Sequence, residues 1–290
     1  MSEIGETYDH LQTKGLKSIL ELRILMKTRR LRESLNEFDT SIAFFDRIGE
    51  RILHFESHTF KARALLLSGD ISSAGECLDY LEKLYHEMDL IPFYKSDYRI
   101  ARFMFDMHQL EDALNSEDKN RIREYRKKAK QSGKHSLKIS RKFKRDRTEA
   151  LKLAGSRRWL LGTAAVDGLL FLGKFLSGLR ALRHYRAAVR WWKKSIDTGT
   201  RLGAKLELSR TYAEIGKHLS GRYLHVDADP EGGISHHHAR IPRGIVRAHA
   251  FATKHIGITP EECLDRAEAM FREMGLEWDL AELEKVRLRL

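Results

Sequence analysis

Apolar residues recur with the period of an α-helix in residues 181–219. In the first half of this stretch they stand at offsets 0, 3, 7, 10 and 14, which places them on one face of a helix with 3.6 residues per turn. These residues are Leu182, Tyr185, Val189, Trp192 and Ile196. Residues 197–199 (Asp-Thr-Gly) interrupt the pattern, and glycine tolerates the left-handed conformation that ends many helices. We therefore expect the first helix to end there.

A second apolar face follows the interruption and includes Leu208, Tyr212, Ile215 and Leu219. Two amphipathic helices joined by a few residues pack as an antiparallel hairpin. The same periodicity predicts further helices along the chain, at residues 7–26, 31–45, 52–66, 74–88, 100–114, from 121 onward, 150–161, 260–274 and 278–288. The helix that begins at Pro260 has the clearest start, because Thr259 supplies the cap and Glu262 stands three residues after it.

The residue types in these helices resemble those of tetratricopeptide repeats. Leu208, Ser209 and Tyr212 are similar to the first helix of that repeat, while Ala188 and Trp192, with Ser195 after them, are similar to the second. The spacing of Ala188 and Trp192 recurs at Ala267 and Phe271. Residues 147–290 also resemble the helical repeats that follow cyclase and ATPase modules in large bacterial signalling proteins.

The resemblance implies an all-α, right-handed α-solenoid of about five irregular TPR-like hairpins with a C-terminal capping helix. We expect a single solenoid over residues 1–290, with divergent hairpins in 1–146 and the clearest repeats in 147–219 and 259–290. Residues 220–258 carry two prolines, five glycines and six histidines, so we expect an insertion loop there. On this interpretation residues 181–219 hold the second helix of one repeat and the first helix of the next. The helix that completes the latter repeat would arrive only after Thr259.

Composition favours a folded helical protein without a disulfide framework. The chain is 42% apolar and 32% charged, and it has only four prolines and two cysteines. The polar N-terminus does not resemble a signal peptide, so we expect a cytoplasmic protein. Residues 159–179 are long enough to span a bilayer, but Asp167, Lys174 and four glycines favour a buried helix instead.

Residues 121–147 contain 13 lysines and arginines against two acidic residues, Glu124 and Asp146. The basic residues are Arg121, Arg123, Arg126, Lys127, Lys128, Lys130, Lys134, Lys138, Arg141, Lys142, Lys144, Arg145 and Arg147. Such a run indicates a surface for an acidic protein, nucleic acid or an anionic membrane, or else a solvated helix face. Only Tyr125 and Phe143 are aromatic in this run, and no nucleic-acid recognition motif is present, so nucleic acid is the less favoured partner.

Three other groups of residues are candidates for function. Trp191 stands beside the apolar stripe, where it packs on a neighbouring repeat or anchors a partner. Arg210 and Glu214 lie on the polar face of the following helix, where they form local ion pairs or contact a partner. Six histidines could bind a metal, but their spacing matches no metal-ligand motif and favours a polar loop; they are His225, His236, His237, His238, His249 and His255.

No cofactor or catalytic motif is found, so the sequence predicts a non-catalytic interaction scaffold or regulatory module that binds a protein partner. One alternative is a nucleic-acid-associated protein that uses residues 121–147. The second alternative is a metal-dependent enzyme that uses the histidines between 225 and 255.

Overall fold

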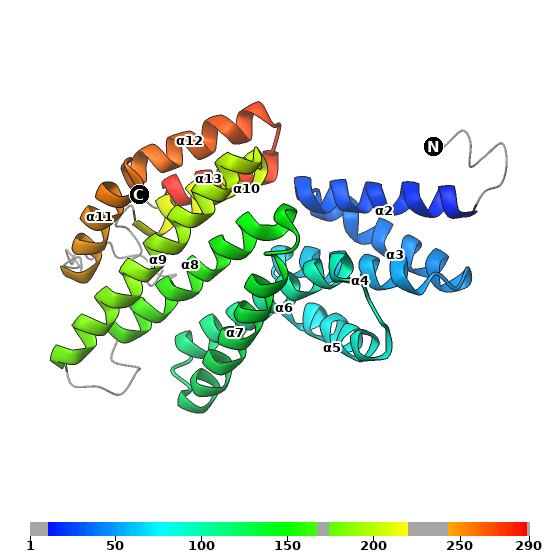
Figure 1. The fold of residues 1–290 in the computed structure, drawn as a ribbon, viewed down its shortest axis with the longest axis horizontal. Helices are drawn as coiled ribbons and strands as arrows, with labels where there is room; N and C mark the ends of the chain where they lie inside the picture. Colours follow the sequence, from blue (N-terminus) through cyan, green and yellow to red (C-terminus); the bar gives the residue numbers. More distant parts are fainter. Residues whose placement is uncertain (1–10, 167–173, 220–242, 289–290) are drawn as a thin grey trace, which may run out of the picture. The chain divides into compact units, whose positions relative to one another are not determined.

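The computed structural model describes residues 11–166, 174–219 and 243–288, and every regular element in these ranges is an α-helix (Figure 1). The chain divides into two compact units, Met1–Ala150 and Leu151–Leu290. The first unit contains α2 (Leu11–Thr28), α3 (Leu31–Arg47), α4 (Arg51–Ser68), α5 (Ile71–Glu87), α6 (Pro92–Asn115), α7 (Lys119–Ile139) and the start of α8 (Lys144–Val166). The second contains the rest of α8 and α9 (Lys174–Leu202), α10 (Lys205–Leu219), α11 (Arg243–Ile256), α12 (Pro260–Glu273) and α13 (Glu277–Leu288). The predicted all-α class is confirmed.

In the first unit, helices that follow one another in sequence pack against one another. α3 lies on α4, α4 on α5, and α6 on α7, while α4 also contacts α2 and α6. Phe55, Leu78 and Tyr98 are fully buried at the centre of this packing, on α4, α5 and α6. Their helices form because each carries apolar residues at helical spacing, and burying these faces together stabilises the unit.

Short turns with recognisable caps separate these helices. Gly69 adopts a φ of 87° after α4, the left-handed conformation that ends many helices. Asp118 caps α7, because its Oδ1 accepts hydrogen bonds from the backbone N–H of Asn120 (2.9 Å) and Arg121 (3.1 Å). The basic run is not one helix, however. α7 ends at Ile139 and α8 begins at Lys144, so residues 121–147 occupy two helices and the turn between them.

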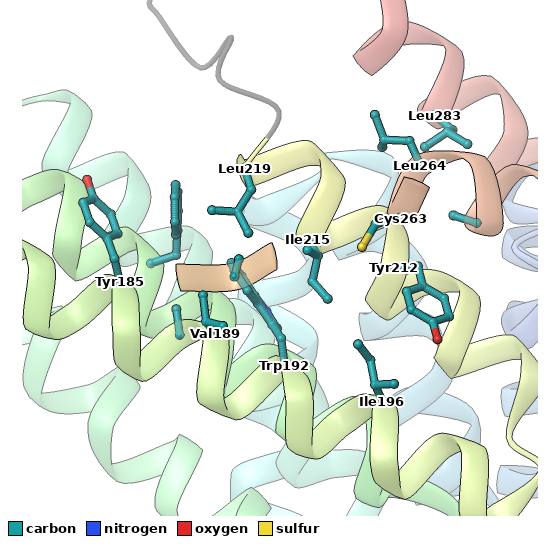
Figure 2. Close-up of a cluster of buried hydrophobic side chains, with 14 of the residues drawn as sticks. Tyr185, Val189, Trp192, Ile196, Tyr212, Ile215, Leu219, Cys263, Leu264 and Leu283 are labelled. Carbon is teal, nitrogen blue, oxygen red and sulfur yellow. The ribbon is translucent and has the colours of Figure 1, made fainter. Parts of the chain in front are cut away.

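The core of the second unit is built on the apolar stripe of α9. Figure 2 shows Tyr185, Val189, Trp192 and Ile196 of this helix facing side chains of α10, α12 and α13. The partners labelled there are Tyr212, Ile215, Leu219, Cys263, Leu264 and Leu283. The stripe predicted from the sequence is therefore the buried face of α9 from Tyr185 to Ile196, while Leu182 at its start is only half-buried.

Two glycines of α8 allow α9 to approach it closely. A Cβ on Gly155 would lie 2.3 Å from Cδ1 of Trp192, and one on Gly162 would lie 2.5 Å from Cε1 of Tyr185. Trp159 stands between these glycines, and its ring centroid lies 4.4 Å from that of Tyr185 and 5.8 Å from that of Trp192. Large aromatic side chains on one helix thus fill the space left by glycine on the other.

The helix break expected at residues 197–199 is wrong. α9 continues to Leu202, and the left-handed position is Gly203, with a φ of 64°. The backbone carbonyl of Gly199 accepts a hydrogen bond from Ala204 N–H (2.9 Å), and Asp197 pairs with Lys193 one turn before it. A single glycine costs a helix only about 1 kcal/mol, which packing of the flanking apolar face offsets.

The expected loop over residues 220–258 is also wrong in its second half, because residues 243–256 form α11, which packs on α9. Residues 220–242 lie outside the described ranges. α12 begins at the predicted cap: Thr259 accepts from the backbone N–H of Glu262 (3.1 Å), and the Glu262 carboxylate accepts from Thr259 N–H (2.6 Å). α12 packs on α10, as the repeat interpretation expects. The sequence does not predict the pairing of α9 with α11.

Among the described residues, no helix is both long and apolar enough to cross a membrane. The stretch 159–179, considered above as a possible span, includes residues 167–173, which lie outside the described ranges.

Candidate functional surfaces

The 13 basic residues of the run 121–147 fall into two groups. Nine are exposed and have no carboxylate oxygen within 4.0 Å among the described residues. They are Arg123, Arg126, Lys127, Lys130, Lys134, Lys138, Arg141, Lys142 and Lys144. A solvated cation without a carboxylate partner has no protein ion pair to give up when it binds an anion, so these nine carry the charge available to a partner.

The other four basic residues are half-buried and already have protein partners. Arg121 pairs with Asp112 (2.7 Å) and Lys128 with Glu124 (2.7 Å). Arg147 donates to the backbone carbonyl of Leu137 at 2.8 Å. Arg145 bonds to Asp97 (2.7 Å) and Asp146 (2.8 Å), and its guanidinium lies 4.4 Å from the ring centroid of Phe93. These four cations therefore form contacts within the first unit.

Six of the exposed cations form one stripe on α7, which we call the α7 stripe: Arg123, Arg126, Lys127, Lys130, Lys134 and Lys138. At about 100° per residue they fall within roughly 120° of the helix circumference, and they extend for about 22 Å along the axis. The opposite side of α7 carries small buried residues, among them Ala129 and Gly133, and it packs on α6. A Cβ on Gly133 would lie 2.8 Å from Cζ of Phe103. Because this side is committed to α6, the stripe faces solvent.

The stripe stands out against the rest of its unit. Outside residues 121–147, the segment 1–150 contains 16 lysines and arginines against 23 aspartates and glutamates, so it is net acidic by seven charges. The positive charge of the unit is thus concentrated on α7 and the turn after it. Tyr125 is the one tyrosine, phenylalanine or tryptophan of α7, and at about 100° per residue it lies roughly 160° around the helix from the middle of the stripe.

Arg210 is part of the interior of the second unit. Its guanidinium is 6% exposed and forms a two-pronged ion pair with Asp279 of α13, at 3.0 Å from Nε and 2.8 Å from Nη2. Its Nη1 also lies 3.5 Å from Oε1 of Glu207 on the same helix. Lys152 completes the cluster through Glu207 at 3.5 Å. The buried Arg210 holds α10 to α13, and its guanidinium is not presented to a partner.

Glu214 is half-buried and joins α10 to α8. Its Oε1 accepts a hydrogen bond from Ser156 Oγ (2.6 Å) and lies 3.0 Å from Nε2 of His218. The ring of His218 stacks on Trp192, with centroids 5.6 Å apart. Burial raises the pKa of Glu214, but His218, Lys217 and Ser156 outweigh this effect and hold it well below its usual range. Glu214 is therefore an ionised, structurally engaged carboxylate.

Trp191 is half-buried at the edge of the α9 core face, and the Lys194 ammonium lies 5.0 Å from its ring centroid.

Four of the six histidines, His225 and His236–His238, lie outside the described residues. His249 and His255 are on α11, where His249 Nε2 lies 3.8 Å from Glu261 and His255 stacks on Phe251. Within the described ranges, no three His, Cys, Asp or Glu side chains are arranged to hold a metal ion.

Sequence reasoning missed a buried ionic network in the first unit. Arg63 is 2% exposed and contacts both Asp97 (2.9 Å) and Glu149 (2.5 Å). Glu56 pairs with Arg23, whose guanidinium lies over the ring of Phe93. Burial raises the pKa of Glu56 to about 7, although Arg23 opposes the shift. Glu56 and Arg63 stand among the apolar residues of α4 in the sequence, and this was the signal that could have indicated the network.

Sequence reasoning also missed a second basic face, on α9. The signal was present in the spacing of Arg183, Arg186, Arg190 and Lys194, which recur every three or four residues opposite the apolar stripe.

No protein-family model matches this chain, and a comparison with curated protein sequences finds no match either.

Proposed function

We propose that this protein is a non-catalytic interaction scaffold, and that the first unit binds an acidic partner protein along the α7 stripe. The observation that carries the proposal is the set of six exposed cations on one helix face, none with a carboxylate within 4.0 Å among the described residues. The two-helix packing and the residue types of α9, α10 and α12 further support a tetratricopeptide-like, right-handed solenoid of the kind found in bacterial signalling assemblies.

An acidic protein suits the α7 stripe better than a nucleic acid does. Four of its six cations are lysines, which act as flexible point charges and do not require planar, two-pronged partners. The one tyrosine, phenylalanine or tryptophan of α7, Tyr125, lies roughly 160° around the helix from the middle of the stripe. Such a surface attracts anions strongly but offers no aromatic ring on which a base could stack.

A binding assay with defined probes tests this function. Fluorescence anisotropy would measure the affinity of the full chain for a labelled peptide rich in Asp and Glu. The α7 triple variant carries Lys127→Gln, Lys130→Gln and Lys134→Gln. We expect it to weaken peptide binding at least tenfold at low salt, because three charges that face the peptide are removed.

A control variant of equal charge change carries Arg32→Gln, Arg47→Gln and Lys83→Gln, all exposed in the same unit. It should bind the peptide within twofold of the wild type. Equal losses in both variants would mean that net charge and not the stripe attracts the peptide, which overturns the proposal. If the α7 triple variant instead loses affinity for an oligonucleotide but keeps its affinity for the peptide, the nucleic-acid alternative for residues 121–147 replaces the acidic-partner proposal.

A further inference from the structure

The second unit carries a basic face of its own on α9. Six cations of this helix are exposed, and none has a carboxylate oxygen within 4.0 Å among the described residues. They are Arg180, Arg183, Arg186, Arg190, Lys194 and Arg201. They fall within roughly 120° of the helix circumference, opposite the buried stripe, and extend for about 30 Å along the axis. The first five are three or four residues apart, where neighbours lie about 5–6 Å from one another, so they form a continuous track, and Arg201 lies two turns beyond Lys194.

The α11 helix extends this face beside α9. Arg247 and Lys254 are exposed, and at about 100° per residue they share one side of α11 with Phe251 and His255. α11 packs directly on α9, and the guanidinium groups of Arg186 and Arg190 lie 5.6 and 6.0 Å from the ring centroid of Phe251. The two helices therefore form one surface, which we call the α9–α11 face.

Negative charge is nearly absent from the α9–α11 face. Asp197 is the one carboxylate that α9 contributes, and it is already paired with Lys193 one turn away. α11 contributes none. Eight exposed cations without a carboxylate partner among the described residues repel one another, so a polyanion that neutralises several of them at once is favoured.

The composition of the face indicates which polyanion. Five of the six α9 cations are arginines, whose planar guanidinium binds phosphate through two parallel hydrogen bonds and stacks on flat rings. Two half-buried aromatic residues lie among them. Phe251 has Arg186, Arg190 and the stacked ring of His255 around it, and Trp191 has Lys194. Arginines interleaved with partly exposed aromatic rings are the combination that binds single strands through backbone charge and base stacking.

We propose that the α9–α11 face binds single-stranded nucleic acid, with the phosphates along the α9 arginines and unpaired bases against Phe251 and Trp191. This inference goes beyond the proposed function and does not depend on it, since it concerns a different surface on a different unit. The α7 stripe is rich in lysine and Tyr125 does not lie on it, so it lacks both features and serves as the internal comparison.

The experiment measures anisotropy of a labelled single strand of about 20 thymidines with the full chain, over roughly 50 to 200 mM salt. The α9 triple variant carries Arg183→Gln, Arg190→Gln and Lys194→Gln. We expect it to lose at least tenfold in affinity and to lower the slope of log K against log salt by about 2, because each phosphate contact on a single strand contributes about 0.7. Phe251→Leu keeps an aliphatic side chain in the core and should lose about fivefold or more in affinity through the lost stacking.

The α7 triple variant removes the same charge from the other unit and should bind the strand within twofold of the wild type. Helical circular dichroism and an unchanged melting temperature confirm that each variant is folded.

Equal losses of affinity in the α7 and α9 triple variants would overturn the proposal, as would an unchanged salt slope in the α9 variant. Tighter binding of a duplex of equal length would overturn it in favour of double-stranded nucleic acid. Displacement of the strand by polyglutamate at equal charge would overturn it in favour of an acidic protein. The acidic-peptide assay with the α7 variant is read separately, so failure of one proposal leaves the other standing.

Discussion

Replacing Gly155 with alanine tests the close packing of α8 on α9. The new Cβ would lie 2.3 Å from Cδ1 and 2.3 Å from Nε1 of Trp192, which is fully buried and cannot swing away. Carbon atoms pack at about 3.5–4.0 Å, so the helices must separate by roughly 1 Å or the indole must leave its site. Overpacking of this kind costs about 1–3 kcal/mol or more, while alanine recovers about 1 kcal/mol of helix propensity. Because the contact is with a rigid ring, we expect a net loss of about 2 kcal/mol.

Tryptophan fluorescence during urea unfolding measures this loss in the second unit alone. All four tryptophans (Trp159, Trp191, Trp192 and Trp278) lie after residue 150, so the signal does not report on the first unit. Gly178→Ala is the matched control, because Gly178 is an exposed glycine of α9 where an added Cβ would have no atom within 4 Å. This control should stabilise the unit by about 0.5–1 kcal/mol. A Gly155→Ala variant that unfolds at the wild-type urea concentration or above would refute the reasoning.

Two further predictions concern buried charges. Arg210→Ala leaves Asp279 buried without its partner and should destabilise the second unit by about 3–5 kcal/mol. Arg210→Met combined with Asp279→Leu removes both buried charges and should restore much of the lost stability. Tryptophan fluorescence during urea unfolding measures the stability of both variants. Burial raises the pKa of Glu56 to about 7 in the folded state from its ordinary value of 4.5, so the folded chain binds this proton more tightly than the unfolded chain. Its contribution to stability is therefore complete below about pH 4.5 and is lost as the pH rises through about 7, and Glu56→Gln should flatten this loss. Hydrogen exchange of α4 between about pH 5 and 8 measures it, and an identical pH dependence in wild type and variant would contradict the assignment.

The helices were predictable wherever an apolar stripe and a cap coincide. The stripe of α9 from Tyr185 to Ile196 is the core face, and Thr259 with Glu262 forms the predicted capping box at the start of α12. Both signals are local, because they depend on residues within a few turns of one another. Helix ends without such a signal were less predictable. The sequence predicts a helix end at Gly199, yet the chain remains helical until Gly203 because packing of α9 overrides one glycine.

The candidate surfaces were also predictable from the sequence only in part. The sequence located the basic run 121–147, but only the structure separates nine exposed cations from the four that Asp97, Asp112, Glu124 and the carbonyl of Leu137 engage. Partners such as Asp97 are distant in sequence from the residues they bind. No pattern along the chain specifies them, because they meet only when α6 and α8 pack in the first unit.

By itself, the sequence determined the helical class, most helix positions and the buried faces of helices with a clear apolar stripe, such as α9, since these follow from periodicity and capping over short distances. Tertiary structure alone decided that α11 pairs with α9, that Arg210 is buried against Asp279, and that the α9 cations and Phe251 form one surface. Each of these depends on side chains brought together from separate helices. Which charges are neutralised, and which remain for a partner, is therefore a property of the packed units and not of any single helix.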